Sequence, residues 1–164
     1  MAGLREVKQN LIWRALQLTV IALLSWSLML LFHEGGHLLG GFLSGAKLQD
    51  YDLVPWRLPY SIHSPDPHPL ITLWSGPIFG VLFPWMLYRV KKGELTDTIF
   101  SFCLLANGAY LLIGWLQEGT QLDTHRLLES GTSPFLILLY SCLTIIPGYI
   151  RLRERFFTGS LTGD

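Results

Sequence analysis

Four long apolar stretches divide the chain. Residues 11–32 contain a single charged residue, and residues 70–88, 98–116 and 134–150 contain none. A helix of about 17–25 apolar residues matches the ~30 Å hydrocarbon core of a bilayer, and it satisfies internally the backbone hydrogen bonds that lipid cannot. We therefore expect an all-α, polytopic membrane protein with four transmembrane helices, the first of which continues to about residue 44.

The connections between these stretches differ in character. Residues 45–69 hold five of the nine prolines, which excludes a long helix there, and a short hairpin or re-entrant segment is expected at about residues 46–60. Within residues 117–133, the sequence LDTHRLLES predicts a short helix that ends at Gly131. We interpret residues 1–164 as a single membrane-embedded domain.

Composition and charge narrow the classes of function. Half of the residues are hydrophobic, 15% are charged, and the twelve basic and twelve acidic residues cancel, which argues against a nucleic-acid-binding protein. Two cysteines cannot form a disulfide framework. Nine of the twelve Lys and Arg residues lie near the termini or in residues 89–97. The positive-inside rule therefore predicts that both termini are cytoplasmic and that residues 45–69 and 117–133 share the non-cytoplasmic face.

One chemical motif follows the first apolar stretch: His33-Glu34-Gly35-Gly36-His37, an H-E-x-x-H sequence. On a helix the two histidines lie one turn apart on the same face and can chelate one metal ion. Imidazole ligands with one open coordination position are typical of catalytic zinc sites, so we expect one Zn²⁺ per chain. Glu34 would lie beside the metal, where it can act as the general acid/base.

A catalytic zinc site needs a third protein ligand, which the topology restricts to residues 45–69 or 117–133. We predict Asp123, which begins the short helix beside a membrane span, and keep His125 and Glu118 as alternatives. On a helix, Asp123 and His125 point about 200° apart, so regular geometry lets only one of them face the metal. The other acidic and histidine candidates in these segments are Asp50, Asp52, His63, Asp66, His68 and Glu129.

In this arrangement the chain resembles the site-2 protease family of intramembrane zinc metalloproteases. The likeness covers about residues 15–130. Besides the H-E-x-x-H motif, it rests on three elements that occur in the family's order: Gly45-Ala46-Lys47 before the possible hairpin, Ser75-Gly76-Pro77 early in the next span, and Leu122-Asp123 before the short helix.

The resemblance implies that the two histidines and Asp123 bind zinc, that Glu34 is the catalytic acid/base, and that the substrate is a membrane protein or peptide cleaved within the bilayer. Residues 45–69 are expected to supply an edge strand that pairs with the unwound peptide. For Asn107, in the middle of a span, an interhelical hydrogen bond is the alternative to a substrate contact. The candidate substrate-binding residues are Asn107, Gly76, Pro77 and His125.

Two other functions are compatible with the same residues. Thr124 and His125 follow Asp123 where the family has glycine, which fits a non-proteolytic membrane protein that retains a metal site for structure or binding. The same zinc chemistry also serves hydrolysis of lipid amides or esters. Zinc content and Glu34-dependent cleavage of model transmembrane peptides distinguish the three hypotheses.

Overall fold

The structure is a computed structural model that describes residues 2–57, 59–117 and 122–158. Four of its helices are long and apolar enough to cross a membrane, as the hydrophobic pattern predicts. In chain order the elements are α1 (Ala2–Ser44), β1 (Leu48–Asp52), β2 (Tyr60–His63), α2 (Pro69–Val90), α3 (Glu94–Gly114), α4 (Asp123–Glu129), α5 (Pro134–Arg153) and a π-helical turn at Glu154–Thr158.

The helix ends follow local chemistry. Both α2 and α5 begin with proline, which is favoured at the first helical position because its missing N–H needs no partner there. The third span begins at Glu94 rather than at residue 98, because Glu94 and Asp97 complement the positive end of the helix dipole in its first turn. The short helix α4 ends before Gly131, whose φ of +91° closes it, and this confirms the predicted end.

The hairpin is present, so the protein is mainly helical but not all-α. β1 and β2 pair antiparallel, with Asp52 opposite Tyr60 and Leu48 opposite His63, and the second strand therefore extends three residues beyond the expected segment. Ser61 and His63 are buried while their neighbours in β2 are exposed, as the two-residue period of a strand requires. The hairpin thus presents one polar pair of side chains to the helices.

A hydrogen bond joins the two strands on the exposed face of the hairpin. The Tyr60 hydroxyl donates to Asp50 Oδ2 at 2.9 Å. This bond and the charge of Asp50 raise the pKa of Tyr60. Deprotonation of the phenol would remove the donor and place two negative charges side by side.

The helices pack as two pairs, α1 against α2 and α3 against α5. Glycines let α1 and α2 approach closely: a Cβ on Gly36 would lie 2.9 Å from the Cα of Gly76, a contact through small residues that is common between membrane helices. Buried apolar side chains of α2, α3, α4 and α5 form one core cluster, made of Leu73, Leu111, Leu127 and Ile137.

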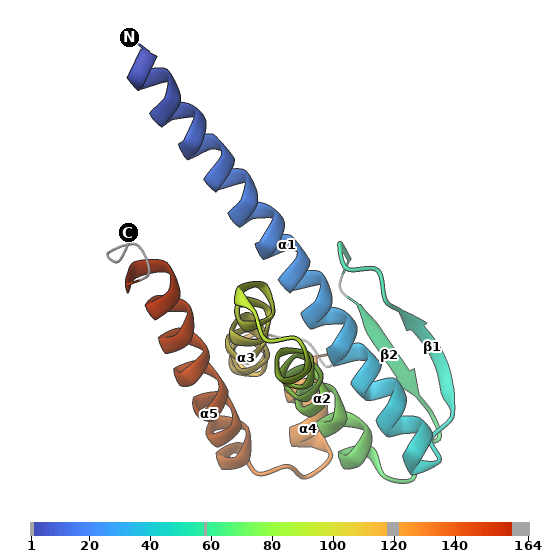
Figure 1. Ribbon diagram of the computed structural model, residues 1–164. Helices are drawn as coiled ribbons and strands as arrows, with labels where there is room; N and C mark the ends of the chain where they lie inside the picture. Colours follow the sequence, from blue (N-terminus) through green and yellow to red (C-terminus); the bar gives the residue numbers. More distant parts are fainter. Residues whose placement is uncertain (1, 58, 118–121, 159–164) are drawn as a thin grey trace.

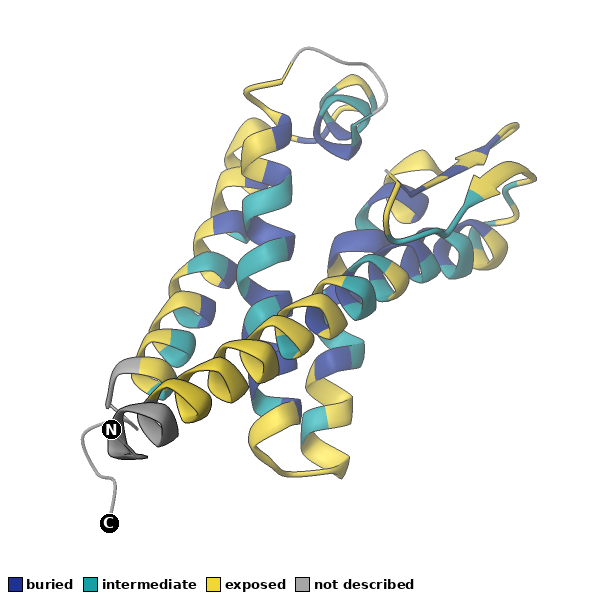
Figure 2. Ribbon diagram, turned by 90° about the horizontal axis from the view of Figure 1, so that it is seen from above, coloured by how far each residue is buried: buried dark blue, intermediate teal, exposed yellow. Residues whose placement is uncertain are grey.

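The start of α1 and the end of α5 lie at one end of the bundle (Figure 1), and the exposed turn between α2 and α3 lies at that end as well (Figure 2). The short helix α4 lies at the opposite end, as the alternation of the connections predicts. There, residues of α4 and of the hairpin line one shared cavity.

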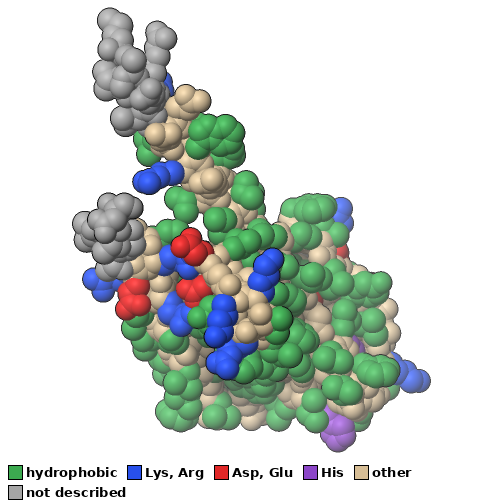
Figure 3. All heavy atoms as spheres, in the orientation of Figure 1, with side chains coloured by type: hydrophobic (Ala, Val, Ile, Leu, Met, Phe, Trp, Pro, Cys, Tyr) green, Lys and Arg blue, Asp and Glu red, His purple; other side chains and the backbone are tan. Residues whose placement is uncertain are grey.

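The outer surface is largely apolar. With 43 residues, α1 is about 65 Å long. Figure 3 shows hydrophobic side chains over most of one face, with charged groups gathered near the start of α3 and the end of α5. There, Arg155 pairs with Asp97 at 3.1 Å and with Glu94 at 3.2 Å. Over residues 8–31 of α1, the exposed large apolar side chains are Leu11, Ile12, Trp13, Leu16, Leu18, Val20, Leu23, Leu24, Trp26 and Leu31.

Candidate metal centre

Three buried side chains from distant parts of the chain converge on one point. His33 and His37 come from α1, and Asp123 is the first residue of α4. The Nε2 atoms of His33 and His37 lie 2.7 and 3.1 Å from Asp123 Oδ2 and 3.2 Å from each other. The three side chains are at most 5% exposed, and this group can hold a metal ion. It contains the residues predicted from the sequence.

Asn107, in the middle of α3, determines which nitrogen of His33 faces this group. Its Nδ2 donates to the carbonyl oxygens of Cys103 at 2.9 Å and Gly80 at 3.1 Å, so its Oδ1 is the atom that lies 2.8 Å from His33 Nδ1. An amide oxygen only accepts hydrogen bonds. His33 Nδ1 therefore carries a hydrogen, and Nε2 of the neutral ring points its lone pair toward Asp123.

The backbone of α2 explains why Asn107 keeps this orientation. Pro84 lies inside α2 and has no N–H to donate to the carbonyl of Gly80, four residues earlier. Asn107 Nδ2 supplies the missing donor. The absence of a side chain at Gly80 makes room for this contact, since a Cβ there would lie 2.9 Å from Asn107 Cγ. Asn107 therefore makes the interhelical hydrogen bond expected as the alternative to a substrate contact.

His37 is oriented in the same way by α2. Its Nδ1 lies 2.9 Å from the carbonyl oxygen of Thr72, which only accepts, so Nδ1 again carries a hydrogen. Gly76 packs directly on the imidazole, and a Cβ at this position would collide with the ring. The ring is therefore held from two directions with its Nε2 toward Asp123.

The chemistry of this donor set is that of a cation site. Burial alone would raise the pKa of the Asp123 carboxyl, but the charge and hydrogen bonds of His37 and His33, when their Nε2 atoms carry hydrogen, hold it well below its usual range, so this carboxylate is an anion. Two imidazole lone pairs and a carboxylate oxygen facing one another in a buried space repel unless a proton or a metal ion lies between them. Backbone or amide acceptors on the far ring nitrogens are typical of histidines that bind metals.

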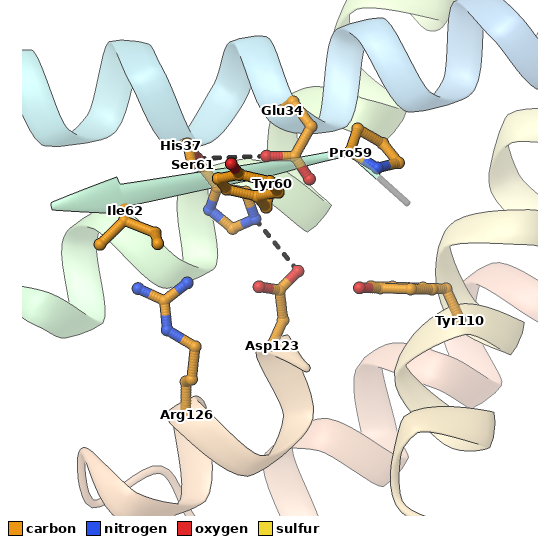
Figure 4. Close-up of a pocket in the computed structure, with 9 residues that line it drawn as sticks. All are labelled: Glu34, His37, Pro59, Tyr60, Ser61, Ile62, Tyr110, Asp123 and Arg126. Carbon is orange, nitrogen blue, oxygen red and sulfur yellow. Dashed lines mark hydrogen bonds and ion pairs between the residues drawn. The ribbon is translucent and has the colours of Figure 1, made fainter. Parts of the chain in front are cut away.

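A cavity of about 290 Å³ opens beside this group. Glu34 lies on its wall (Figure 4), where its Oε2 accepts a hydrogen bond from Ser61 Oγ at 3.1 Å. Glu34 is thus beside the converging ligand atoms and not among them, as the motif predicts. The cavity is lined by Glu34, His37, Pro59, Tyr60, Ser61, Ile62, Tyr110, Asp123 and Arg126.

The backbone of β2 forms one side of the cavity. Side chains of a strand alternate between faces, so three consecutive lining residues of β2, 60–62, with Pro59 directly before them, indicate that an edge of the strand faces the cavity. β1 occupies one edge of β2, and no strand in the described part of the chain pairs with the other. That edge can accept an extended peptide.

The other ligand candidates that the structure describes do not join the group. His125 is turned away, with its Nε2 2.7 Å from the carbonyl oxygen of Gln117, as its helical position relative to Asp123 requires. His63 is buried, but its Nδ1 has no hydrogen-bond partner among the described residues, and burial lowers its pKa. Glu118 lies outside the described residues.

The residues expected to contact substrate do not line the cavity. Asn107 holds His33, and Gly76 packs on His37. The Pro77 carbonyl accepts a hydrogen bond from a tyrosine hydroxyl of α5 at 2.7 Å, and His125 faces Gln117. The cavity is instead lined by Tyr110, Arg126 and residues of β2. No sequence motif identifies these residues as part of the site. The position of Arg126, one helical turn after Asp123, is the only sequence signal for it.

No protein-family model matches the chain, and no curated protein or solved structure matches it either.

Proposed function

We propose that the protein is a zinc metalloprotease that hydrolyses peptide bonds in or near transmembrane segments, as its resemblance to the site-2 protease family implies. The observation that supports this most strongly is the convergence of two histidine Nε2 atoms and Asp123 Oδ2 beside a cavity with Glu34 on its wall. The donor set suits zinc, which takes imidazole and carboxylate ligands and keeps an open position in catalytic sites.

Zinc bound by these residues would make a water molecule more acidic and polarise a peptide carbonyl. Glu34 takes the proton of the attacking water and passes it to the nitrogen of the leaving amine. The hydrogen bond from Ser61 holds the Glu34 carboxylate at the cavity wall. Asn107 and the Thr72 carbonyl keep both imidazoles in the tautomer that the metal requires.

The edge of β2 that no described strand occupies supports a peptide rather than a lipid as the substrate. A transmembrane helix hides its carbonyl groups in internal hydrogen bonds, so the cleaved segment must first unwind. An unwound segment can recover backbone hydrogen bonds by pairing with β2, which brings it past Glu34 and the histidines. Substrates with helix-weakening residues near the cleaved bond are therefore favoured.

The test compares metal content with cleavage in the purified, lipid-reconstituted full chain. Wild type should contain about one zinc per chain, measured by inductively coupled plasma mass spectrometry, and should cleave quenched-fluorescent transmembrane peptides. Glu34→Gln should keep the zinc and lose at least about 100-fold in rate, the usual size of a general acid/base contribution. Glu129→Gln makes the same chemical change at an exposed position of α4 and should behave like wild type.

The outcomes separate the competing functions. Zinc with no Glu34-dependent cleavage of any peptide would identify a non-proteolytic metal-binding protein. Glu34-dependent release of fatty acid from labelled lipid amides or esters, without peptide cleavage, would identify a lipid hydrolase. Wild-type protein that binds no zinc would contradict the metal site itself.

A further inference from the structure

Among the described residues, Arg126 is the one Lys or Arg side chain that lines the cavity, and the mechanism above does not use it. Figure 4 shows its guanidinium rising from α4 beside Asp123 and pointing toward Ile62 of β2. The residue is partly buried. Among the described residues, its guanidinium has no hydrogen-bond partner and no carboxylate within ion-pair distance.

The charges of the side chains that line the cavity do not balance once a metal ion is bound. Its lining contains two carboxylates, those of Glu34 and Asp123, and one guanidinium. A bound divalent cation balances the two carboxylates and leaves the charge of Arg126 without a counterpart. Partly buried charges are costly unless they are paired. The loaded cavity is therefore complementary to a ligand that brings one negative charge.

We propose that Arg126 binds a carboxylate of the substrate, either an acidic side chain close to the cleaved bond or the C-terminal carboxylate of the peptide. This inference rests on the proposed protease function and adds the chemical class of the preferred substrate. A guanidinium suits this role because its planar N–H groups match a carboxylate with two parallel hydrogen bonds.

The direction of β2 predicts where the carboxylate lies. Glu34 contacts Ser61, whereas Arg126 points toward Ile62, the next residue of the strand. Strand residues advance by about 3.3 Å each. A peptide paired with the free edge of β2 would therefore place its carboxylate within about two residues of the cleaved bond, on the side that faces Ile62.

Binding can be measured without turnover in the zinc-loaded Glu34→Gln full chain. The ligands are four fluorescent transmembrane peptides that combine Glu or Gln two residues from the cleavage position with a free or an amidated C-terminus. Fluorescence anisotropy in detergent micelles gives each dissociation constant. We expect one acidic group, internal or terminal, to strengthen binding by about 10- to 100-fold, as hydrogen bonds to charged groups do. The affected pair of peptides identifies which carboxylate is bound.

Variants of Arg126 in the same background separate recognition from folding. Arg126→Gln should abolish the preference and leave the neutral peptide's affinity unchanged, Arg126→Lys should retain part of it, and Arg126→Glu should favour a peptide with Lys at that position. Glu118→Gln tests an acidic residue outside the described part of the chain and should not change the preference.

Three results would overturn the proposal. The first is equal binding of all four peptides, and the second is an Arg126→Gln variant that weakens all of them equally, which is the signature of a structural role. A preference that emerges only with Glu118→Gln would show that Arg126 is already paired within the chain. In these cases peptide binding, and with it the proposed function, stands. Failure to bind any peptide would contradict both.

Discussion

The structure predicts that Asn107 controls metal affinity without touching the metal. Asn107→Leu removes the acceptor for His33 Nδ1, so the imidazole can place its hydrogen on Nε2 and lose the lone pair that faces Asp123. Loss of a group that orients a ligand typically costs 10- to 100-fold in metal affinity, which corresponds to about 1.4–2.7 kcal/mol.

The same substitution also leaves the Gly80 carbonyl without a donor, because Pro84 cannot supply one. An unsatisfied buried carbonyl costs about 1–3 kcal/mol of folding stability. Asn107→Asp is the matched variant: it keeps an oxygen for His33 Nδ1 but replaces the two donor hydrogens by a second oxygen. It should therefore lose stability to a similar extent while zinc affinity stays close to that of wild type.

The two effects are measured separately. Zinc affinity comes from competition with a chromogenic chelator in micelles, and stability comes from thermal unfolding of the zinc-free protein followed by circular dichroism. A folded Asn107→Leu variant whose zinc affinity lies within about twofold of wild type would refute the orienting role. Equal losses of zinc affinity in both variants would also refute it, because they would assign the effect to disturbed packing.

Three further predictions concern the ligands, the membrane orientation and the hairpin. Asp123→Ala should lose zinc, whereas His125→Ala should retain it in the same metal assay; the reverse pattern would indicate a site with three histidines. Ser64→Cys, in a background without the two native cysteines, should react in intact cells with an impermeant thiol reagent added from outside, and labelling only after the membrane is opened would reverse the predicted orientation. Asp50→Asn removes the charge that raises the pKa of Tyr60, so part of the phenolate absorbance at 295 nm should titrate at lower pH than in wild type; identical titration curves would contradict the bond across the hairpin.

The sequence predicted the parts of the site that depend on short-range geometry. His33 and His37 are one helical turn apart, so their common face follows from the helix itself. Asp123 is 90 residues from His33. Its place in the site could still be predicted, because four spans leave only two connections at the end of the bundle where the histidines lie. The placement of Glu34 beside the ligands follows from its position next to His33.

Contacts between elements could not be predicted in the same way. The role of Asn107 depends on which face of α3 meets α1 and α2, and on a carbonyl freed by Pro84 in a different helix. Tyr110 and Arg126 become cavity residues only after the hairpin is placed over α4. The sequence around each of these residues does not show which residue of another element it will contact, because helix packing determines that contact.

In the proposed protease, the close glycine contact between α1 and α2 would restrict the path by which a peptide reaches Glu34. Side-chain-free positions such as Gly36 and Gly76 bring the two backbones together, and a passage between these helices would pull His37 away from the Thr72 carbonyl. A route that leaves His37 in place would run past the hairpin, which joins α1 through Gly45 at a φ of +79°. A crosslink between the hairpin and α4 should therefore exclude long peptides while small hydrophilic chelators still extract the metal.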